Sequence, residues 1–327
     1  RDRLRSRGLG DVYKRQLFVD RDNDIWMYSP LGIWVYNPEQ EKWLSWLTNI
    51  IKRRSHNMVR AVSQDKQGRI WIGTDQDGID ILDKKTGEVR QLRNKTGDER
   101  SLQNNTVMVL YEDSSETMWV GTYKKGISYF NECAFKFGAE YIGDISCIEE
   151  DKEGYVWLGT NDVGIIYWNS VTGNRAAFPQ KGTDKLTTDA IVCILKAGDG
   201  KLWIGTFGGG LICYDNGRII HYKKNIPERQ NSLAHNNVLA LAEDKQGIIW
   251  IGTLGGGVQS LNPKTGLFTT YNTTSAGLIS DYVSSLCMGK EGSLWIGTAQ
   301  GLSELDIETK KVVNLEGTKS GKEYFSD

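Results

Sequence analysis

Several features that would indicate a particular chemistry are scarce in this sequence. The chain has only 3 histidines, 5 prolines and 5 cysteines in 327 residues, and it contains neither Cys-x-x-Cys nor His-Glu-x-x-His. The common zinc motifs are therefore missing, and five irregularly spaced cysteines do not make a disulfide framework. No run of 18 apolar residues occurs, so no transmembrane helix is indicated. We expect no metal site, no cofactor and no membrane contact.

Excess charge of either sign is also missing. Lysine and arginine total 40 against 41 acidic residues, a formal net charge of -1. Nucleic-acid binders usually carry a basic excess, so a nucleic-acid partner is not expected. Glycine is abundant at 37 residues, and the 11 tryptophans and 39% hydrophobic content are enough for a sizeable core. The composition therefore indicates a folded protein rich in turns.

A tetrapeptide repeats along the chain. Tryptophan, an apolar residue, glycine and threonine follow one another six times, and Trp26-Met-Tyr-Ser is a degenerate copy. The tryptophans are 38 to 48 residues apart, and a second glycine follows each of them after six or seven residues. Seven copies in register indicate a repeat architecture. The repeat tryptophans are Trp26, Trp71, Trp119, Trp157, Trp203, Trp250 and Trp295.

Each repeat reads as four short strands separated by turns that contain Asp, Asn and Gly. In the second repeat these strands are 58–62, 69–74, 79–82 and 88–92. A period near 45 residues with four strands predicts an all-β fold, a seven-bladed β-propeller of four-stranded antiparallel blades with little helix. We expect each tryptophan to pack between neighbouring blades and its glycine to allow close approach. Blade 3 should have the shortest outer portion, because only 38 residues separate Trp119 from Trp157.

The extended repeat resembles the two-component regulator propeller repeat. Val238–Gly247 followed by Trp250-Ile-Gly-Thr253 is a good copy, and the resemblance covers roughly residues 17–315. It implies the periplasmic sensor region of a hybrid two-component system histidine kinase of the Bacteroidetes type. Such a region recognises glycan fragments and regulates carbohydrate-utilisation genes. Kinase activity would lie in other domains, so this chain is expected not to be an enzyme.

The two ends do not fit the repeat. Residues 1–16 carry four net positive charges and match no part of it, so we interpret them as a non-native segment. Residues 17–317 are predicted to form a single propeller. Residues 318–327 are interpreted as the truncated lead-in to a further strand or domain. Aligning Asp20 with Asp65 places Gln16 where Ala61 lies, which predicts a disrupted innermost strand in blade 1.

Loop composition distinguishes the two faces of the predicted ring. Turns after the first and third strands, such as Asp65–Gly68, are regular and polar, and we name this side the regular-turn face. Acidic runs there, such as Glu149-Glu150-Asp151, are expected to be solvated. Turns after the second strand and connections between blades vary more, and this side is the variable face. Binding residues commonly lie on variable loops of a rigid scaffold. The candidate ligand-binding residues are Asn57, Asn105, Tyr123, Asp189, Phe207, Asn236 and Asp281.

Two other functions stay open. A propeller enzyme of the lyase or hydrolase type would need converging histidines or carboxylates, and only His56 and His235 occupy equivalent positions before an inner strand. A protein-interaction scaffold is the second alternative, although the Gly-His and Trp-Asp signatures of WD repeats are missing from the blades. The leading interpretation has an oligosaccharide as the ligand, with a homodimer formed through the parent receptor as a further partner.

Overall fold

The structure, a computed structural model, describes most of the 327 residues. The described residues are 16–29, 32–54, 58–98, 101–131, 136–140, 142–169, 175–178, 186, 190–224, 231–289 and 292–316. The predicted boundaries at 16/17 and 317/318 stay predictions, because residues 1–15 and 317–327 lie outside these ranges and Gln16 is the first residue described.

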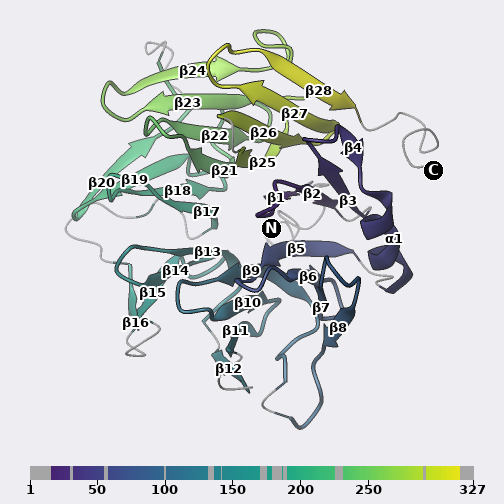
Figure 1. Ribbon diagram of the computed structural model, residues 1–327. Helices are drawn as coiled ribbons and strands as arrows, with labels where there is room; N and C mark the ends of the chain where they lie inside the picture. Colours follow the sequence, from purple (N-terminus) through teal and green to yellow (C-terminus); the bar gives the residue numbers. More distant parts are fainter. Residues whose placement is uncertain are drawn as a thin grey trace, which may run out of the picture.

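In the described ranges, twenty-eight strands form seven separate four-stranded antiparallel sheets arranged around a centre (Figure 1). The innermost strands are β1 (Gln16–Val19), β5 (Val59–Gln64), β9 (Val107–Glu112), β13 (Ile145–Glu150), β17 (Ile191–Lys196), β21 (Val238–Glu243) and β25 (Val283–Met288). The second strands are β2 (Ile25–Ser29), β6 (Ile70–Thr74), β10 (Met118–Thr122), β14 (Tyr155–Thr160), β18 (Leu202–Thr206), β22 (Ile249–Thr253) and β26 (Ser293–Thr298). The third are β3 (Gly32–Asn37), β7 (Ile79–Leu82), β11 (Gly126–Asn131), β15 (Ile165–Asn169), β19 (Leu211–Asp215), β23 (Val258–Asn262) and β27 (Gly301–Asp306). The outermost are β4 (Lys42–Trp43), β8 (Val89–Leu92), β12 (Lys136–Glu140), β16 (Arg175–Ala177), β20 (Arg218–Tyr222), β24 (Leu267–Tyr271) and β28 (Val312–Glu316). The seven-bladed propeller predicted from the repeat is confirmed.

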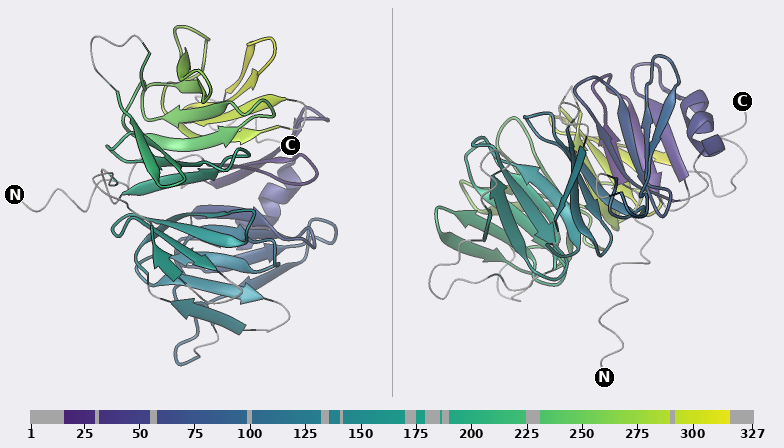
Figure 2. Two further views of the ribbon diagram at one scale, coloured as in Figure 1. Left: turned by 90° about the vertical axis from the view of Figure 1, so that its left-hand side faces the viewer. Right: turned by 90° about the horizontal axis from the view of Figure 1, so that it is seen from below.

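The core lies between the blades, whose sheets face one another around the ring (Figure 2). Trp71 of blade 2 is 1% exposed and belongs to a cluster with Val107 and Val120 of blade 3. Trp250 of blade 6 likewise clusters with Val283 and Ile296 of blade 7. One sheet cannot bury both of its faces alone, and the ring of tryptophans solves this by joining each blade to the next.

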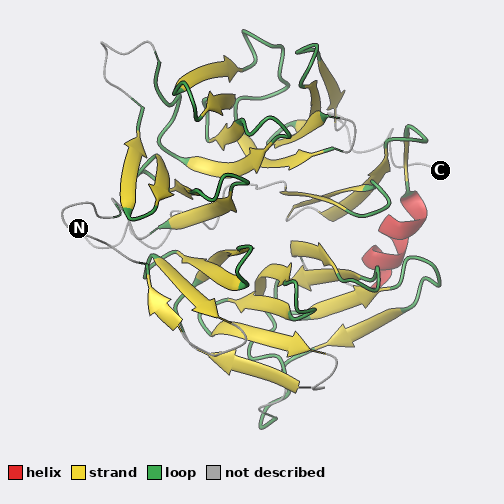
Figure 3. Ribbon diagram, turned by 60° about the vertical axis from the view of Figure 1, so that its left-hand side comes forward, coloured by secondary structure: helices red, strands yellow, loops and turns green. Residues whose placement is uncertain are grey.

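Within the described residues, one helix departs from the four-strand pattern. Helix α1 (Ser45–Arg54) lies between β4 and β5 in the chain and on the outside of the ring (Figure 3). Leu47 and Ile51 are buried, and they cluster with Trp26 and Val35 of blade 1. The pair is spaced i, i+4, so one helix face covers the edge of the blade. No helix in the described ranges is long and apolar enough to cross a membrane.

The expectation for blade 3 is wrong. Its outermost strand β12 has five residues, whereas β4 of blade 1 has two and β16 of blade 4 has three. The short spacing arises instead in the connection, since β12 ends at Glu140 and β13 begins at Ile145. Repeat length in this propeller therefore varies mainly in the links between blades, which are less constrained than the strands.

A hydrogen bond from the indole N–H to an aspartate fixes most of the repeat tryptophans. In five blades an aspartate six residues earlier accepts the indole N–H, at 2.7 Å in Asp65–Trp71 and 2.9 Å in Asp244–Trp250. The other carboxylate oxygen accepts backbone N–H groups of the same turn, as Asp113 does from Ser115 and Thr117. These carboxylates thus join the turn to the interface between blades. The remaining pairs are Asp20–Trp26, Asp113–Trp119 and Asp151–Trp157.

Blade 5 lacks this carboxylate, and this gives a stability prediction. Ala197 replaces the aspartate, and Trp203 Nε1 has no hydrogen-bond partner among the described residues. The turn is otherwise the same, because Gly200 N donates to Ala197 O as Gly68 N does to Asp65 O. We expect Ala197→Asp to raise the free energy of unfolding by about 1 kcal/mol, measured by urea denaturation. The gain should vanish in a Trp203→Phe background, and an equal gain in that background would contradict the assignment.

Candidate functional site

Threonine side chains shape the variable face. The last residue of the tetrapeptide closes the turn between the second and third strands, as Thr253 Oγ1 does by donating to Gly257 O at 3.1 Å. The same bond occurs from Thr206 to Gly210 at 2.7 Å. These threonines are fully buried. The turns on the variable face therefore differ in the residues at their tips but are closed by the same threonine–glycine hydrogen bond.

Three of the sequence-predicted ligand residues have equivalent structural roles. Asn105 Oδ1 accepts the Asn94 N–H at 2.7 Å, Asn236 Oδ1 accepts Lys224 N–H at 2.6 Å, and Asp281 Oδ1 accepts Thr273 N–H at 2.7 Å. In each case the backbone carbonyl also accepts an N–H from the glycine that ends the neighbouring turn, Gly78, Gly210 or Gly257. One side-chain oxygen of each residue is thus already used to tie the end of an outer strand to the next connection.

The other four candidates are less constrained or lie outside the description. Tyr123 is 41% exposed, and the Lys124 ammonium lies 4.9 Å from its ring centroid. Phe207 is half-buried, and its N–H donates to Ala190 O at 3.1 Å. Asn57 and Asp189 fall outside the described residues. The five described candidates are spread over turns and connections of blades 3, 5, 6 and 7, and the role of all seven in binding stays a prediction.

Sequence reasoning missed a polar group on the same face. Arg60 Nη2 lies 2.7 Å from Asp75 Oδ2, and Thr106 Oγ1 donates to Asp75 Oδ1 at 3.1 Å. Arg60 lies at a β-bulge of β5, where the pairing shifts between Val59 and Ala61. Bulges re-aim side chains in this way. Sequence gave no signal for the bulge, because its position depends on strand pairing.

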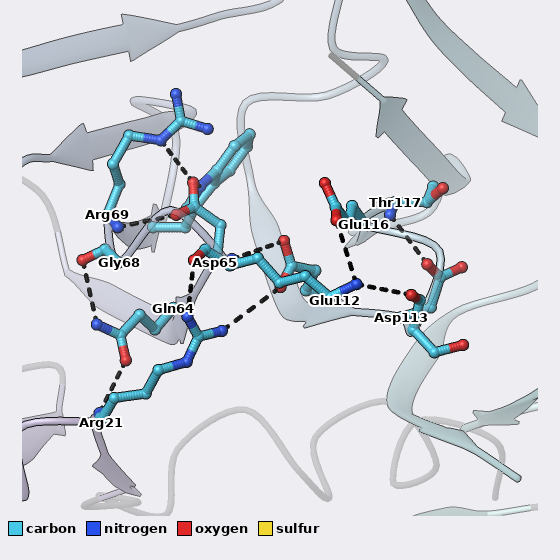
Figure 4. A network of polar contacts seen from close by, with 12 residues as sticks. Arg21, Gln64, Asp65, Gly68, Arg69, Glu112, Asp113, Glu116 and Thr117 are labelled. Carbon is cyan, nitrogen blue, oxygen red and sulfur yellow. Dashed lines mark hydrogen bonds and ion pairs between the residues drawn. The ribbon is translucent and has the colours of Figure 1, made fainter. Parts of the chain in front are cut away.

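On the regular-turn face, polar side chains connect successive blades (Figure 4). Gln64 Oε1 of blade 2 accepts Arg21 N–H of blade 1 at 2.8 Å, and Glu112 Oε1 of blade 3 accepts Lys66 N–H of blade 2 at 3.0 Å. Glu150 of blade 4 accepts both the N–H and the hydroxyl of Ser114 in blade 3. The prediction that Glu149-Glu150-Asp151 is merely solvated is therefore wrong, because inner-strand acids reach the turn of the blade before.

Glu149 has an unusual titration. Burial raises the pKa of its carboxyl to about 7, and the neighbouring Glu150 carboxylate acts in the same direction. The Lys196 N–H, which donates to Glu149 Oε1 at 3.2 Å, acts in the opposite direction. The folded protein thus favours the protonated form more than the unfolded chain does.

This shift predicts a pH-dependent stability. A raised pKa in the folded state contributes stability that is complete below the ordinary value of 4.5 and is lost as the pH rises through about 7. At a pH well above 7, Glu149→Gln should be more stable than the wild type by about 1 kcal/mol, because glutamine keeps an acceptor for Lys196 without a charge. Urea denaturation at acid and alkaline pH tests this. An equal difference at both pH values would contradict it.

Among the described residues, two open grooves lie on the regular-turn face, on either side of blade 7. The larger, of about 850 Å³, separates blade 6 from blade 7 and is lined by residues that include Asp244, Trp250, Ser260, Thr269 and Lys310. The smaller, of about 380 Å³, separates blade 7 from blade 1. The larger volume is within the range of small-molecule sites. Both grooves therefore lie on the face opposite to the variable loops.

At the junction of blades 1 and 2, a cation fills the corresponding space. Lys84 Nζ lies 2.6 Å from Asp20 Oδ2 and 2.8 Å from both Asp22 Oδ2 and Asp24 Oδ2. Three carboxylates at this spacing have the geometry of a metal site. Their hydrogen bonds to Lys84 raise the pKa of that ammonium despite its burial. The ammonium takes the position that a metal ion would need.

Comparison with known proteins identifies the repeat. The sequence matches the two component regulator propeller at residues 54–76, 101–124, 142–162, 185–208, 232–255 and 277–300. Each match covers the innermost and second strands of one blade, from blade 2 to blade 7, and blade 1 with its degenerate tetrapeptide is not matched. No curated protein matches the sequence.

The solved structures to which this chain is similar include two that share its fold at low identity. PorZ of the type-IX secretion system of Porphyromonas gingivalis is 12% identical with a TM-score of 0.67, over 94% of this chain and 54% of that one. Virginiamycin B lyase from Staphylococcus aureus is 13% identical with a TM-score of 0.64, over 82% and 87%. The extracellular domain of BT4673 from B. thetaiotaomicron is 20% identical with a TM-score of 0.46, and this chain spans 45% of it. Six matched repeats in six successive blades carry the assignment: the chain belongs to the two-component regulator propeller family.

Proposed function

We propose that this chain is a ligand-sensing propeller of a two-component signalling receptor. The observation that carries the proposal is the match of six blades to the two component regulator propeller. The segment works on the periplasmic side of the inner membrane and binds its ligand without converting it. Kinase activity belongs to other parts of the receptor.

The ligand that we propose is a soluble glycan fragment, and the receptor regulates carbohydrate-utilisation genes. Two features support this ligand. The groove between blades 6 and 7 has a suitable volume, and its walls carry uncharged amide and hydroxyl side chains, such as Gln246 and Asn262, together with apolar ones, such as Leu267. Sugar rings present both hydroxyl groups and apolar C–H faces, so they need a site of this mixed character.

Calorimetric titration with a panel of soluble oligosaccharides tests the proposal. At least one member should bind with a dissociation constant in the micromolar range, about -8 kcal/mol. Chromatography of the sugar after incubation should recover it unchanged. A well-folded protein that binds no member of the panel would count against a glycan sensor, and a converted sugar would favour an enzyme.

A further inference from the structure

Blades 6 and 7, whose residues line the two grooves, differ from the other blades at one position of the repeat. In every blade one residue of the third strand pairs directly with the repeat tryptophan of the second strand. In blades 1 to 5 this residue is apolar or aromatic, whereas in blades 6 and 7 it is Ser260 and Glu304. The pairs are Trp26–Val35, Trp71–Ile81, Trp119–Tyr129, Trp157–Tyr167, Trp203–Cys213, Trp250–Ser260 and Trp295–Glu304.

In the earlier blades the paired residue covers the tryptophan. The Tyr129 ring centroid lies 5.4 Å from that of Trp119, and the Tyr167 centroid lies 5.3 Å from that of Trp157. Val35, Ile81 and Cys213 are themselves buried. Ser260 is too short to do this, and it lines the larger groove, just as Glu304 lines the smaller one. The loss of a covering side chain thus coincides with each hollow.

On the wall of the larger groove, a second polar residue lies beside Ser260, on the outermost strand of blade 6. Ser260 of β23 pairs with Thr269 of β24, so both hydroxyl groups lie side by side on the wall. Neither hydroxyl has a hydrogen-bond partner in the part of the chain that is described. Leu267, which is 58% exposed, lies two residues before Thr269 and adds an apolar surface. Hydroxyl groups beside exposed aliphatic surface form a surface suited to a sugar.

The charges around the larger groove favour a neutral ligand over an acidic one. Four carboxylates line it against two lysines. Three of the carboxylates already accept backbone N–H groups: Glu243 from Gly198, Asp244 from Gln246, and Asp306 from Glu308. The Lys310 ammonium is held 5.6 Å from the ring centroid of Trp250. The excess of negative charge would repel a uronic acid, so a neutral sugar fits better than an acidic one.

We propose that the groove between blades 6 and 7, on the regular-turn face, binds a short neutral oligosaccharide. This rests on the proposed function and places its ligand opposite to the variable face. Ser260 and Thr269 contact the hydroxyl groups of the sugar, and Leu267 contacts its C–H face. Asn105, Asn236 and Asp281 on the variable face have an oxygen engaged in strand ends, which leaves them less able to serve a ligand.

Substitutions drawn from the repeat itself test this location. Ser260→Tyr should fill the groove with the residue type that blades 3 and 4 carry at the same position, so the fold should be kept. Thr269→Val keeps the shape of an exposed side chain and removes its hydroxyl. The neutral oligosaccharide found to bind best, from a panel of cello-, xylo-, malto- and laminari-oligosaccharides, should bind Ser260→Tyr at least about tenfold more weakly than the wild type. Thr269→Val should also weaken binding, by a smaller factor.

Tyr123→Ala removes a candidate residue of the variable face and so distinguishes the two faces: if the sugar lies in the groove, this variant binds it with unchanged affinity. Loss of binding in Tyr123→Ala together with full binding by Ser260→Tyr and Thr269→Val would overturn the groove and leave the proposed function standing. Absence of binding to the wild type by every neutral sugar would overturn both. An oligogalacturonide that binds more tightly than every neutral sugar would overturn the neutral class.

Discussion

Replacing Trp203 by alanine is expected to lower the free energy of unfolding by about 3–5 kcal/mol, the usual cost of truncating a large buried aromatic. Trp203 is 1% exposed and belongs to the cluster that joins blade 5 to Val238, Ile249 and Ile251 of blade 6. Its indole N–H makes no hydrogen bond with the described residues, so the loss comes from packing alone. Urea denaturation followed by circular dichroism measures it.

The exposed Lys124→Ala on the variable face is the control for this experiment. Its side chain is exposed, and its ammonium lies 4.9 Å from the ring centroid of Tyr123, which is itself 41% exposed. Surface changes of this kind usually stay within about 0.5 kcal/mol. Equal shifts for the two variants would contradict the view that stability lies in the interfaces between blades.

Gly205→Ala is the second change with a large expected effect. A Cβ at Gly205 would lie 2.8 Å from Val238 Cγ1 and 3.2 Å from the Val238 carbonyl oxygen in the next blade, and it would overlap Cys193 Sγ. Neither a packed side chain nor a strand backbone can move freely, so the blades must separate. We expect a loss of about 1–3 kcal/mol, measured by the same denaturation.

Gly198→Ala provides the matched glycine. Its added Cβ would meet only the Glu243 carboxylate, at 3.5 Å, which is an ordinary contact. This variant should differ little from the wild type. If Gly198→Ala were as damaging as Gly205→Ala, general loss of glycine flexibility would explain the effect better than close approach of blades.

The sequence was sufficient to predict the blades because each must bury the same surface. The tryptophan and the glycine after it recur for that reason. Their positions in the sequence identify the second strand of each blade. The six-residue spacing from aspartate to tryptophan recurs in the sequence, but an aspartate is also common in turns, so the spacing alone does not predict the Asp–Trp hydrogen bond. Helix α1 was not predicted because it occurs once, and its buried residues Leu47 and Ile51 contact a blade rather than repeat a pattern.

The site was harder to predict, for a physical reason. Loop residues such as Asn236 look available in a sequence, yet their side chains fold back to accept backbone N–H groups. The importance of Ser260 depends on its pairing with Trp250 across two strands, and it becomes visible only when the pairing registers of all seven blades are compared. A strand position at which one blade carries a different kind of residue from the equivalent positions of the other blades therefore indicates a binding site better than a variable loop does.

Hydrogen–deuterium exchange of the wild-type protein, with and without its best-binding neutral oligosaccharide, tests the central claim most directly. The claim is that this propeller senses a sugar held between blades 6 and 7. The account predicts slower exchange of backbone amides in the turn at 244–248, in β24 and in the turn at 306–310 when the sugar is bound. Protection confined to the turns at 123–125 and 207–209 of the variable face, with none between blades 6 and 7, would contradict it.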